Sequence, residues 1–64
     1  MKELDEVTIP PYIAEKFGVV GSGTIVWYVQ GANYATVECA VIGDNLQGLE
    51  TKLVDVDINE LRLR

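Results

Sequence analysis

Apolar and polar residues alternate along this chain in short segments, which Gly, Pro and Asn residues separate. A period of two, combined with many β-branched and aromatic residues, is typical of β-strands. The pattern predicts strands over residues 5–9, 24–30, 34–42 and 49–58. After a tight turn at INEL, the closing LRLR predicts a short final strand. We therefore expect an all-β protein.

A short helix is predicted between the first two strands, in YIAEKFG over residues 12–18. Pro10 and Pro11 end the first strand because proline cannot donate to a β-ladder, and proline is favoured at the first position of a helix. Gly18 is suited to the left-handed position that ends a helix. An irregular loop is the alternative. We expect three side chains to anchor the segment: Tyr12, Ile13 and Phe17.

The stretch GVVGSGTIVWYV, residues 18–29, contains three closely spaced glycines, Gly18, Gly21 and Gly23. They faintly match a dinucleotide-binding motif, but that motif needs a helix after its last glycine. The residues that follow here, TIVWYV, are typical of a strand. Glycine also adopts positive φ angles that turn the chain sharply. We therefore expect the glycines to turn the chain into the strand over residues 24–30.

Alternation predicts which side chains of each strand share a face. Ile25, Trp27 and Val29 share one face of the second strand, while Val26 and Tyr28 lie on the other. We expect Trp27 in the core, because so small a chain needs its largest apolar side chain there. The third strand has an apolar face of Ala35, Val37, Cys39 and Val41.

Turns and irregularities are predicted at two further places. In the turn QGAN, Gly31 and Asn33 are suited to left-handed positions. In the fourth strand, Leu53 and Val54 are adjacent apolar residues that break the alternation. A β-bulge near Leu53 would reconcile them with a single buried face.

Five short strands, a long first connection and tight hairpins predict one domain over residues 1–64, a small five-stranded barrel. The runs DEVTI, GTIVWYV, YATVE and VDINELRL resemble the SH3-like small barrels of bacteria and phages over nearly the whole chain. The resemblance rests on structural motifs and implies a fold without a specific chemistry. A weaker resemblance, in GTIVWY and YATVE, is to the type II dihydrofolate reductases. Their Val-Gln-Ile-Tyr motif is missing from LETKLVDVDI.

Charge and composition narrow the function classes. Five Lys and Arg residues against ten Asp and Glu residues give a formal net charge of −5, which disfavours nucleic-acid binding and favours a basic partner. The chain has one cysteine and no histidine, so we expect no disulfide and no zinc cluster. It contains no signal-peptide pattern and no apolar run of about 20 residues. We expect a cytoplasmic protein without a cofactor.

Few side chains offer catalytic or metal-binding chemistry. Asp55 and Asp57 share a strand face, which is typical of a solvated outer surface; the alternative is a site for a hard cation such as Ca²⁺. Cys39 and Ser22 lack a histidine base, so we expect Cys39 to be a small buried hydrophobe. Glu38 is expected to pair across strands with Thr24 or Lys52. We therefore expect no enzymatic activity.

Aromatic residues are the best candidates for binding. Tyr28 and Tyr34 flank the QGAN turn and are expected close together on the outer face. With Tyr12, Asp44 and Glu50 they form a predicted partner-binding surface. This favours a non-enzymatic protein-interaction module, an accessory, inhibitory or immunity-like protein of a phage or mobile element, which binds a partner or itself. The alternative is an oligomeric enzyme with a site in a central pore, as in the type II dihydrofolate reductases.

Overall fold

The computed structural model describes residues 1–42 and 50–64, so Asp44 lies outside the described residues. These residues form five antiparallel strands in one sheet of order β4-β3-β2-β1-β5, which confirms the all-β prediction. The elements are β1 (Glu6–Thr8), α1 (Pro11–Phe17), β2 (Val19–Trp27), β3 (Tyr34–Val41), β4 (Thr51–Asp57), the 3₁₀ helix η1 (Ile58–Glu60) and β5 (Arg62–Leu63).

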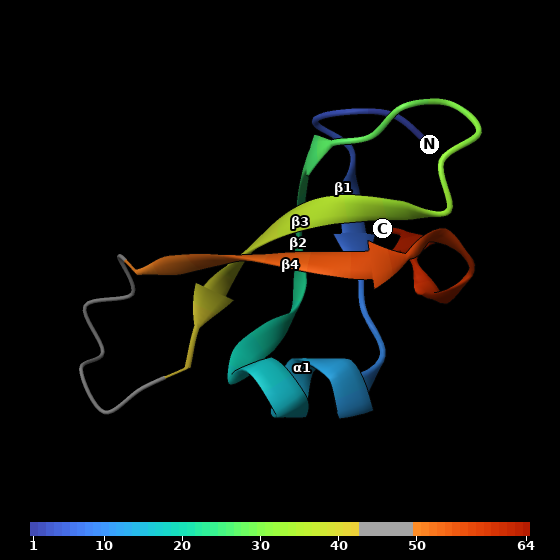
Figure 1. Cartoon of the computed structure of the whole chain (residues 1–64). Coiled ribbons are helices and arrows are strands. Elements are labelled where there is room, and N and C mark those ends of the chain that lie inside the picture. The colour runs from blue at the N-terminus through green and yellow to red at the C-terminus, as the bar shows by residue number, and fades with distance from the viewer. Residues whose placement is uncertain (43–49) are drawn as a thin grey trace.

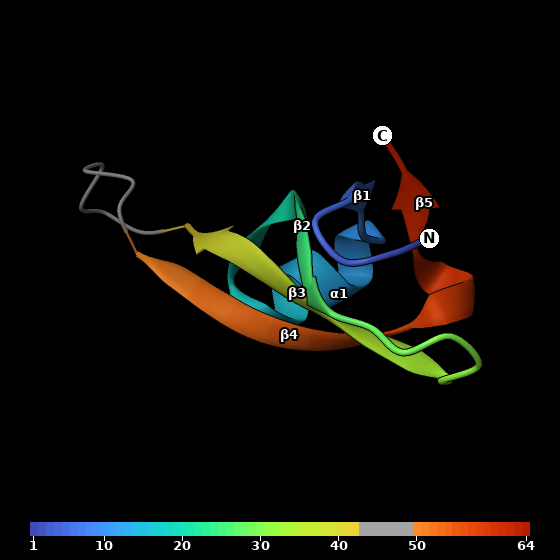
Figure 2. The ribbon, with the colours of Figure 1, turned by 90° about the horizontal axis from the view of Figure 1, so that it is seen from above.

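The sheet is strongly twisted. Figure 1 shows β3 and β4 running across β2 and β1, with α1 at the end of the molecule opposite the loop between β2 and β3. Seen from above in Figure 2, β3 and β4 curve side by side along the lower part of the picture, and β1 and β5 lie in its upper part. Among the described residues no pairing joins β4 to β5, so closure of the sheet into a barrel stays a prediction.

The core lies on the concave side of this sheet, and every long strand contributes to it. The predicted apolar face of the third strand is confirmed: Ala35, Val37 and Cys39 are buried, and Val41 is half-buried. The other buried residues are Val7, Ile9, Ala14, Val19, Ile25, Val54, Val56 and Leu61. Alternation therefore predicted the buried face of β3 correctly.

The helix α1 confirms the predicted helical segment and its end. Pro11 is its first residue, and Gly18, with φ of 69°, ends it with its N–H directed to the carbonyl oxygens of Ala14 and Glu15. Ile13 and Phe17 pack against the core as expected. Tyr12 does not anchor the helix, because its side chain is 62% exposed; Ala14 is the buried residue instead.

The glycines after α1 do not act as predicted, because β2 already begins at Val19. Of the three, Gly18 alone has a positive φ, and Gly21 and Gly23 lie inside the strand. Since β2 continues to Trp27, the helix that a dinucleotide-binding motif needs does not follow. Gly23 pairs with Val7 on one side and Cys39 on the other, where the backbones leave no room for a side chain.

A β-bulge changes the direction of the aromatic residues at the end of β2. Ile25 pairs with Val37 and Trp27 pairs with Thr36, so Val26 is an extra residue on β2. A bulge of this kind shifts the side chains that follow it to the opposite face. Trp27 is therefore 38% exposed, and its predicted place in the core is wrong. Tyr28 packs partly buried against the core instead.

Two smaller predictions about turns and bulges are also wrong. β4 pairs with β3 in unbroken register, from Tyr34 with Asp57 to Ala40 with Thr51, so the bulge expected near Leu53 is not there. Leu53 points outward instead and is 61% exposed. In the turn between β2 and β3, Gly31 has the expected positive φ of 91°. Asn33 does not, since Leu4 is the one non-glycine residue with positive φ in the described part of the chain.

Replacing Leu4 by glycine is expected to stabilise the protein. Leu4 has φ of 72° with its side chain 79% exposed, so the change removes backbone strain and little burial. Leu4→Ala keeps the Cβ atom that causes the strain and is the matched control. We expect Leu4→Gly to exceed Leu4→Ala in free energy of unfolding by about 1 kcal/mol in urea titrations. An alanine variant equal to or more stable than the glycine variant would contradict this interpretation.

Candidate interaction site

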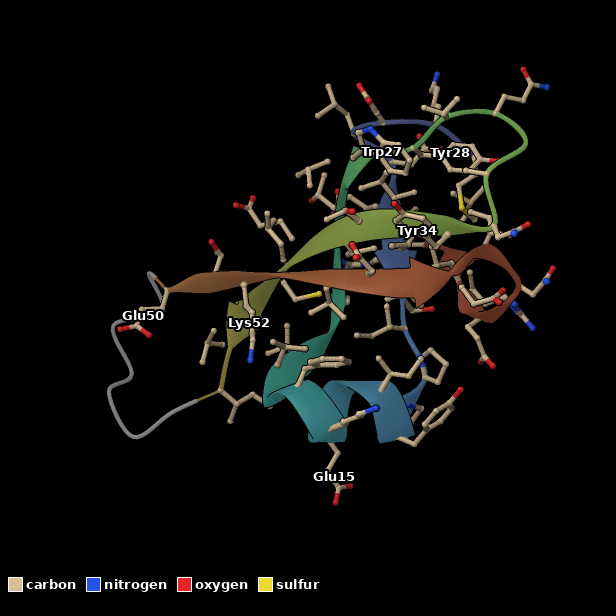
Figure 3. All side chains as sticks on the ribbon, viewed as in Figure 1. Glu15, Trp27, Tyr28, Tyr34, Glu50 and Lys52 are labelled. Carbon is tan, nitrogen blue, oxygen red and sulfur yellow. The ribbon has the colours of Figure 1, made fainter. Side chains whose placement is uncertain are left out.

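Two aromatic side chains stack on the outer face of the sheet, where β2 ends and β3 begins. The ring centroids of Trp27 and Tyr34 are 5.2 Å apart, and the ring planes are inclined by 27°. Figure 3 shows both rings near the loop between β2 and β3. Tyr34 is 43% exposed, which is close to the exposure of Trp27. A large amphipathic aromatic pair is thus held in a fixed geometry and open to solvent.

Two carboxylates of β4 border this pair on the same face. Asp57 is the direct partner of Tyr34 in the register of β3 and β4, and Asp55 is the partner of Thr36, which itself pairs with Trp27. The Thr36 hydroxyl donates to Asp55 Oδ1 at 2.7 Å. The Asn59 backbone N–H donates to Asp57 Oδ1 at 2.8 Å. In each aspartate, a hydrogen bond to Oδ1 thus fixes the orientation of the carboxylate. We call Trp27, Tyr34, Asp55 and Asp57 the aromatic–acidic face.

The carboxylates of this face have no cationic partner in the described structure. The one ion pair among residues 1–42 and 50–64 joins Arg64 to Glu6 at 3.2 Å. Lys52 lies on the other side of β4, and its ammonium group donates to the carbonyl oxygen of Phe17 at 3.4 Å. The negative charge of the aromatic–acidic face is therefore available to a partner.

Glu38 extends the acidic character of the outer face along β3. The prediction that Glu38 pairs across strands with Thr24 is confirmed, because Thr24 is its partner on β2. Its partner on β4 is Leu53 and not Lys52. The Thr51 hydroxyl donates to Glu38 Oε2 at 3.2 Å. Glu38 is thus a surface residue held by a neighbouring strand.

The metal and nucleophile chemistry that the sequence offers can be compared with the structure. The described residues contain no group of three or more His, Cys, Asp or Glu side chains placed to hold a metal ion. Asp55 and Asp57 therefore have no third carboxylate beside them in this part of the chain. Cys39 is fully buried, as predicted, and burial raises the pKa of its thiol. A buried neutral thiol is a poor nucleophile.

The predicted site residues are scattered over the molecule. Tyr34 lies on the aromatic–acidic face, but Tyr28 lines a separate open hollow of about 740 Å³ with Met1, Lys2, Glu3 and Gln30. Glu50 lies just before β4, at the end of that strand far from the aromatic rings (Figure 3). Tyr12 lies on α1, at the opposite end of the molecule from the loop between β2 and β3 (Figure 1). The structure therefore does not gather the predicted residues into one surface.

Tyr12 lies near acidic side chains of another element. The Glu60 carboxylate, as an acceptor for the Tyr12 hydroxyl, raises the pKa of that hydroxyl, and partial desolvation and the negative charges of Glu60 and Asp57 raise the pKa further. Because Tyr12 lies on α1 and its side chain is 62% exposed, it makes a suitable control for experiments on the aromatic–acidic face.

The comparisons with known proteins add no functional information. No protein-family model, no curated protein and no solved structure matches the chain. The SH3-like and reductase-like resemblances accordingly stay predictions. In the described part of the chain, each helix is too short to span a lipid bilayer.

Proposed function

We propose that this protein is a non-enzymatic protein-interaction module that binds a basic segment of a partner protein at its aromatic–acidic face. The observation that carries the proposal is the exposed stack of Trp27 and Tyr34 beside the carboxylates of Asp55 and Asp57. Exposed tryptophan and tyrosine residues are enriched where proteins bind one another. The proposal keeps Tyr34 from the predicted surface and replaces Tyr28 by Trp27.

The chemistry of this face suits Arg and Lys side chains. A cation above an aromatic ring is attracted by the negative ring face, and Trp is the strongest such platform. A carboxylate beside the ring adds a charge-assisted hydrogen bond, which Arg can make with two N–H groups at once. The net charge of −5 also attracts a basic partner and repels the phosphates of nucleic acids.

The arrangement of the strands supports the wider interpretation of the chain. The first and last strands pair with each other, and the order β4-β3-β2-β1-β5 brings all five strands around one core. This order supports the resemblance to SH3-like barrels, several of which bind peptides through exposed aromatic residues. A single buried and unpaired cysteine supports a reducing compartment, the cytoplasm.

Neutralising the two carboxylates is expected to weaken binding of a basic peptide. We use the synthetic peptide VTRTRTV, with VTETETV as its acidic counterpart. In the double variant Asp55→Asn and Asp57→Asn, the affinity for VTRTRTV measured by calorimetry is expected to fall about tenfold, because two exposed charge pairs are lost. The asparagine at 57 keeps an acceptor for the Asn59 N–H.

The matched control removes the same number of negative charges at sites far from the aromatic–acidic face. Glu15 lies on the exposed side of α1, and Glu50 precedes β4; Figure 3 shows both far from the aromatic rings. We expect Glu15→Gln with Glu50→Gln to bind VTRTRTV nearly as tightly as the wild type. Equal losses in the two double variants would mean that net charge alone attracts the peptide. Stronger binding of VTETETV would overturn the proposed function.

A further inference from the structure

Among the described strands, β4 forms the long edge of the sheet. β4 is the first strand in the sheet order, its one paired neighbour among the described strands is β3, and it has seven residues. The opposite edge, β5, has only two residues. An edge strand presents backbone N–H and C=O groups that another extended chain can pair with. β4 is therefore the place in the described structure where an added strand would find the longest backbone partner.

The side chains of β4 define what an added strand would meet on each face. Val54 and Val56 are buried toward the core. Leu53, Asp55 and Asp57 are exposed on the outer face, at alternate positions. A strand added beside β4 would place its own alternate side chains directly opposite these three residues. Its outer-face pattern would then be apolar opposite Leu53 and cationic opposite each aspartate.

A second copy of this chain fits that edge poorly. Pairing β4 with β4 would bring Asp55 and Asp57 of both copies onto one face, while Lys52, the one cation of the strand, lies on the other. Like charges on neighbouring strands destabilise a sheet. The aspartates of β4 thus disfavour pairing with a second copy of β4 and favour pairing with a basic strand.

We propose that the basic segment of the partner binds as an additional β-strand along β4, with Arg or Lys side chains opposite Asp55 and Asp57. This inference rests on the proposed function and specifies its binding mode. Main-chain pairing would supply affinity, and the alternate side chains would supply specificity. The recognised segment would have the outer-face pattern apolar, basic, basic at every second residue.

The added strand would reach the aromatic stack as well as the carboxylates. Neighbouring strands lie about 4.8 Å apart, so a residue opposite Asp57 starts two strand spacings from Tyr34. An extended Arg side chain covers most of that separation. It would pair with the Asp57 carboxylate and bring its guanidinium close to the Tyr34 ring, on which Trp27 stacks.

Backbone methylation of the probe peptide tests the binding mode. VTRTRTV has the apolar and basic pattern in both directions, so it fits β4 in parallel or antiparallel orientation. One derivative carries N-methyl groups on its Arg and Val amides and the other on its Thr amides. In a strand these two sets of N–H groups point to opposite sides. One derivative is expected to lose at least about tenfold in affinity and the other to bind nearly as the parent peptide.

Hydrogen exchange gives a second, independent measurement. On addition of VTRTRTV, backbone amides of β4 that point away from β3 are expected to gain protection, and those of β5 to remain unchanged. Equal affinities of both methylated derivatives, without new protection in β4, would overturn strand addition and leave the proposed function standing. Absence of binding by the unmethylated peptide would overturn both. A dimer of this chain with protected β4 amides would show that a second copy occupies the edge.

Discussion

Replacing Gly23 by alanine is expected to cost about 3 kcal/mol of unfolding free energy, which is most of the stability that a domain of this size has. An added Cβ atom would collide with the carbonyl oxygen of Glu38 and lie 2.8 Å from Val37 Cγ1 and 2.9 Å from Cys39 Sγ. All three belong to β3, which pairs with β2 at this point. Because one obstacle is backbone, the strands must separate to admit the methyl group.

Gly21→Ala is the matched control for this prediction. Gly21 lies in the same strand, but a Cβ atom there would meet its nearest neighbour, the Ile9 carbonyl oxygen, at 3.8 Å. We expect Gly21→Ala to change the free energy of unfolding by less than about 1 kcal/mol. The unfolding midpoint of Gly23→Ala is expected to lie roughly 12–24 °C below that of the wild type. Similar unfolding temperatures for the two alanine variants would show that Gly23 is not the point of closest approach between β2 and β3.

Removing both rings of the aromatic–acidic face is expected to weaken binding of VTRTRTV by about tenfold, because an Arg side chain held against an aromatic ring contributes about 1–2 kcal/mol. The variant is Trp27→Ser with Tyr34→Ser. Both side chains are partly exposed, so the variant is expected to keep the fold, which circular dichroism checks. Calorimetric titration then measures the affinity.

Tyr12→Ser is the control for these aromatic substitutions. Tyr12 is the most exposed tyrosine of the described structure and lies on α1, away from the rings of Trp27 and Tyr34. It was part of the surface predicted from the sequence, so the comparison also decides between that prediction and the structure. If Tyr12→Ser lowers the affinity as much as the double variant, the binding surface includes α1 and the aromatic–acidic face is not the site.

The predictable parts of this fold are those in which one strand face is apolar and the other polar. In β3, the apolar residues Ala35, Val37 and Cys39 alternate with the polar residues Thr36 and Glu38, so periodicity alone identified the buried face. The end of α1 was equally predictable, since Gly18 follows a helical segment that begins with prolines. In both places local chemistry agrees with the tertiary structure.

The end of β2 was not predictable in the same way. In TIVWYV both faces are apolar, so no polar residue marks the position where Val26 bulges out and the alternation changes. The exposure of Trp27 follows from that bulge, which depends on pairing with β3. At Leu53 the sequence suggested an irregularity that is not there. Leucine is usually a core residue, so its position beside Val54 suggested a bulge, but β4 pairs with β3 in regular register and Leu53 is exposed.

The candidate site was predictable only in part, for the same reason. Tyr34 and its outward direction followed from the alternation in β3, and the exposed face of Asp55 and Asp57 followed from that in β4. That these residues lie beside Trp27 depends on the register between β2, β3 and β4. A local sequence pattern does not specify this register. Glu50 and Tyr12 were grouped with Tyr34 by residue type, although the fold places them at other ends of the molecule.

The fluorescence of Trp27 tests the central claim most directly, because Trp27 is the only tryptophan of the chain and belongs to the proposed site. The emission of the free protein should be that of a partly exposed indole, open to a soluble quencher. Adding VTRTRTV should shift the emission, because an Arg side chain then lies close to the Tyr34 ring on which Trp27 stacks, and adding VTETETV should not. An indole that is already inaccessible in the free protein, or one that does not respond while VTRTRTV binds, would contradict the account.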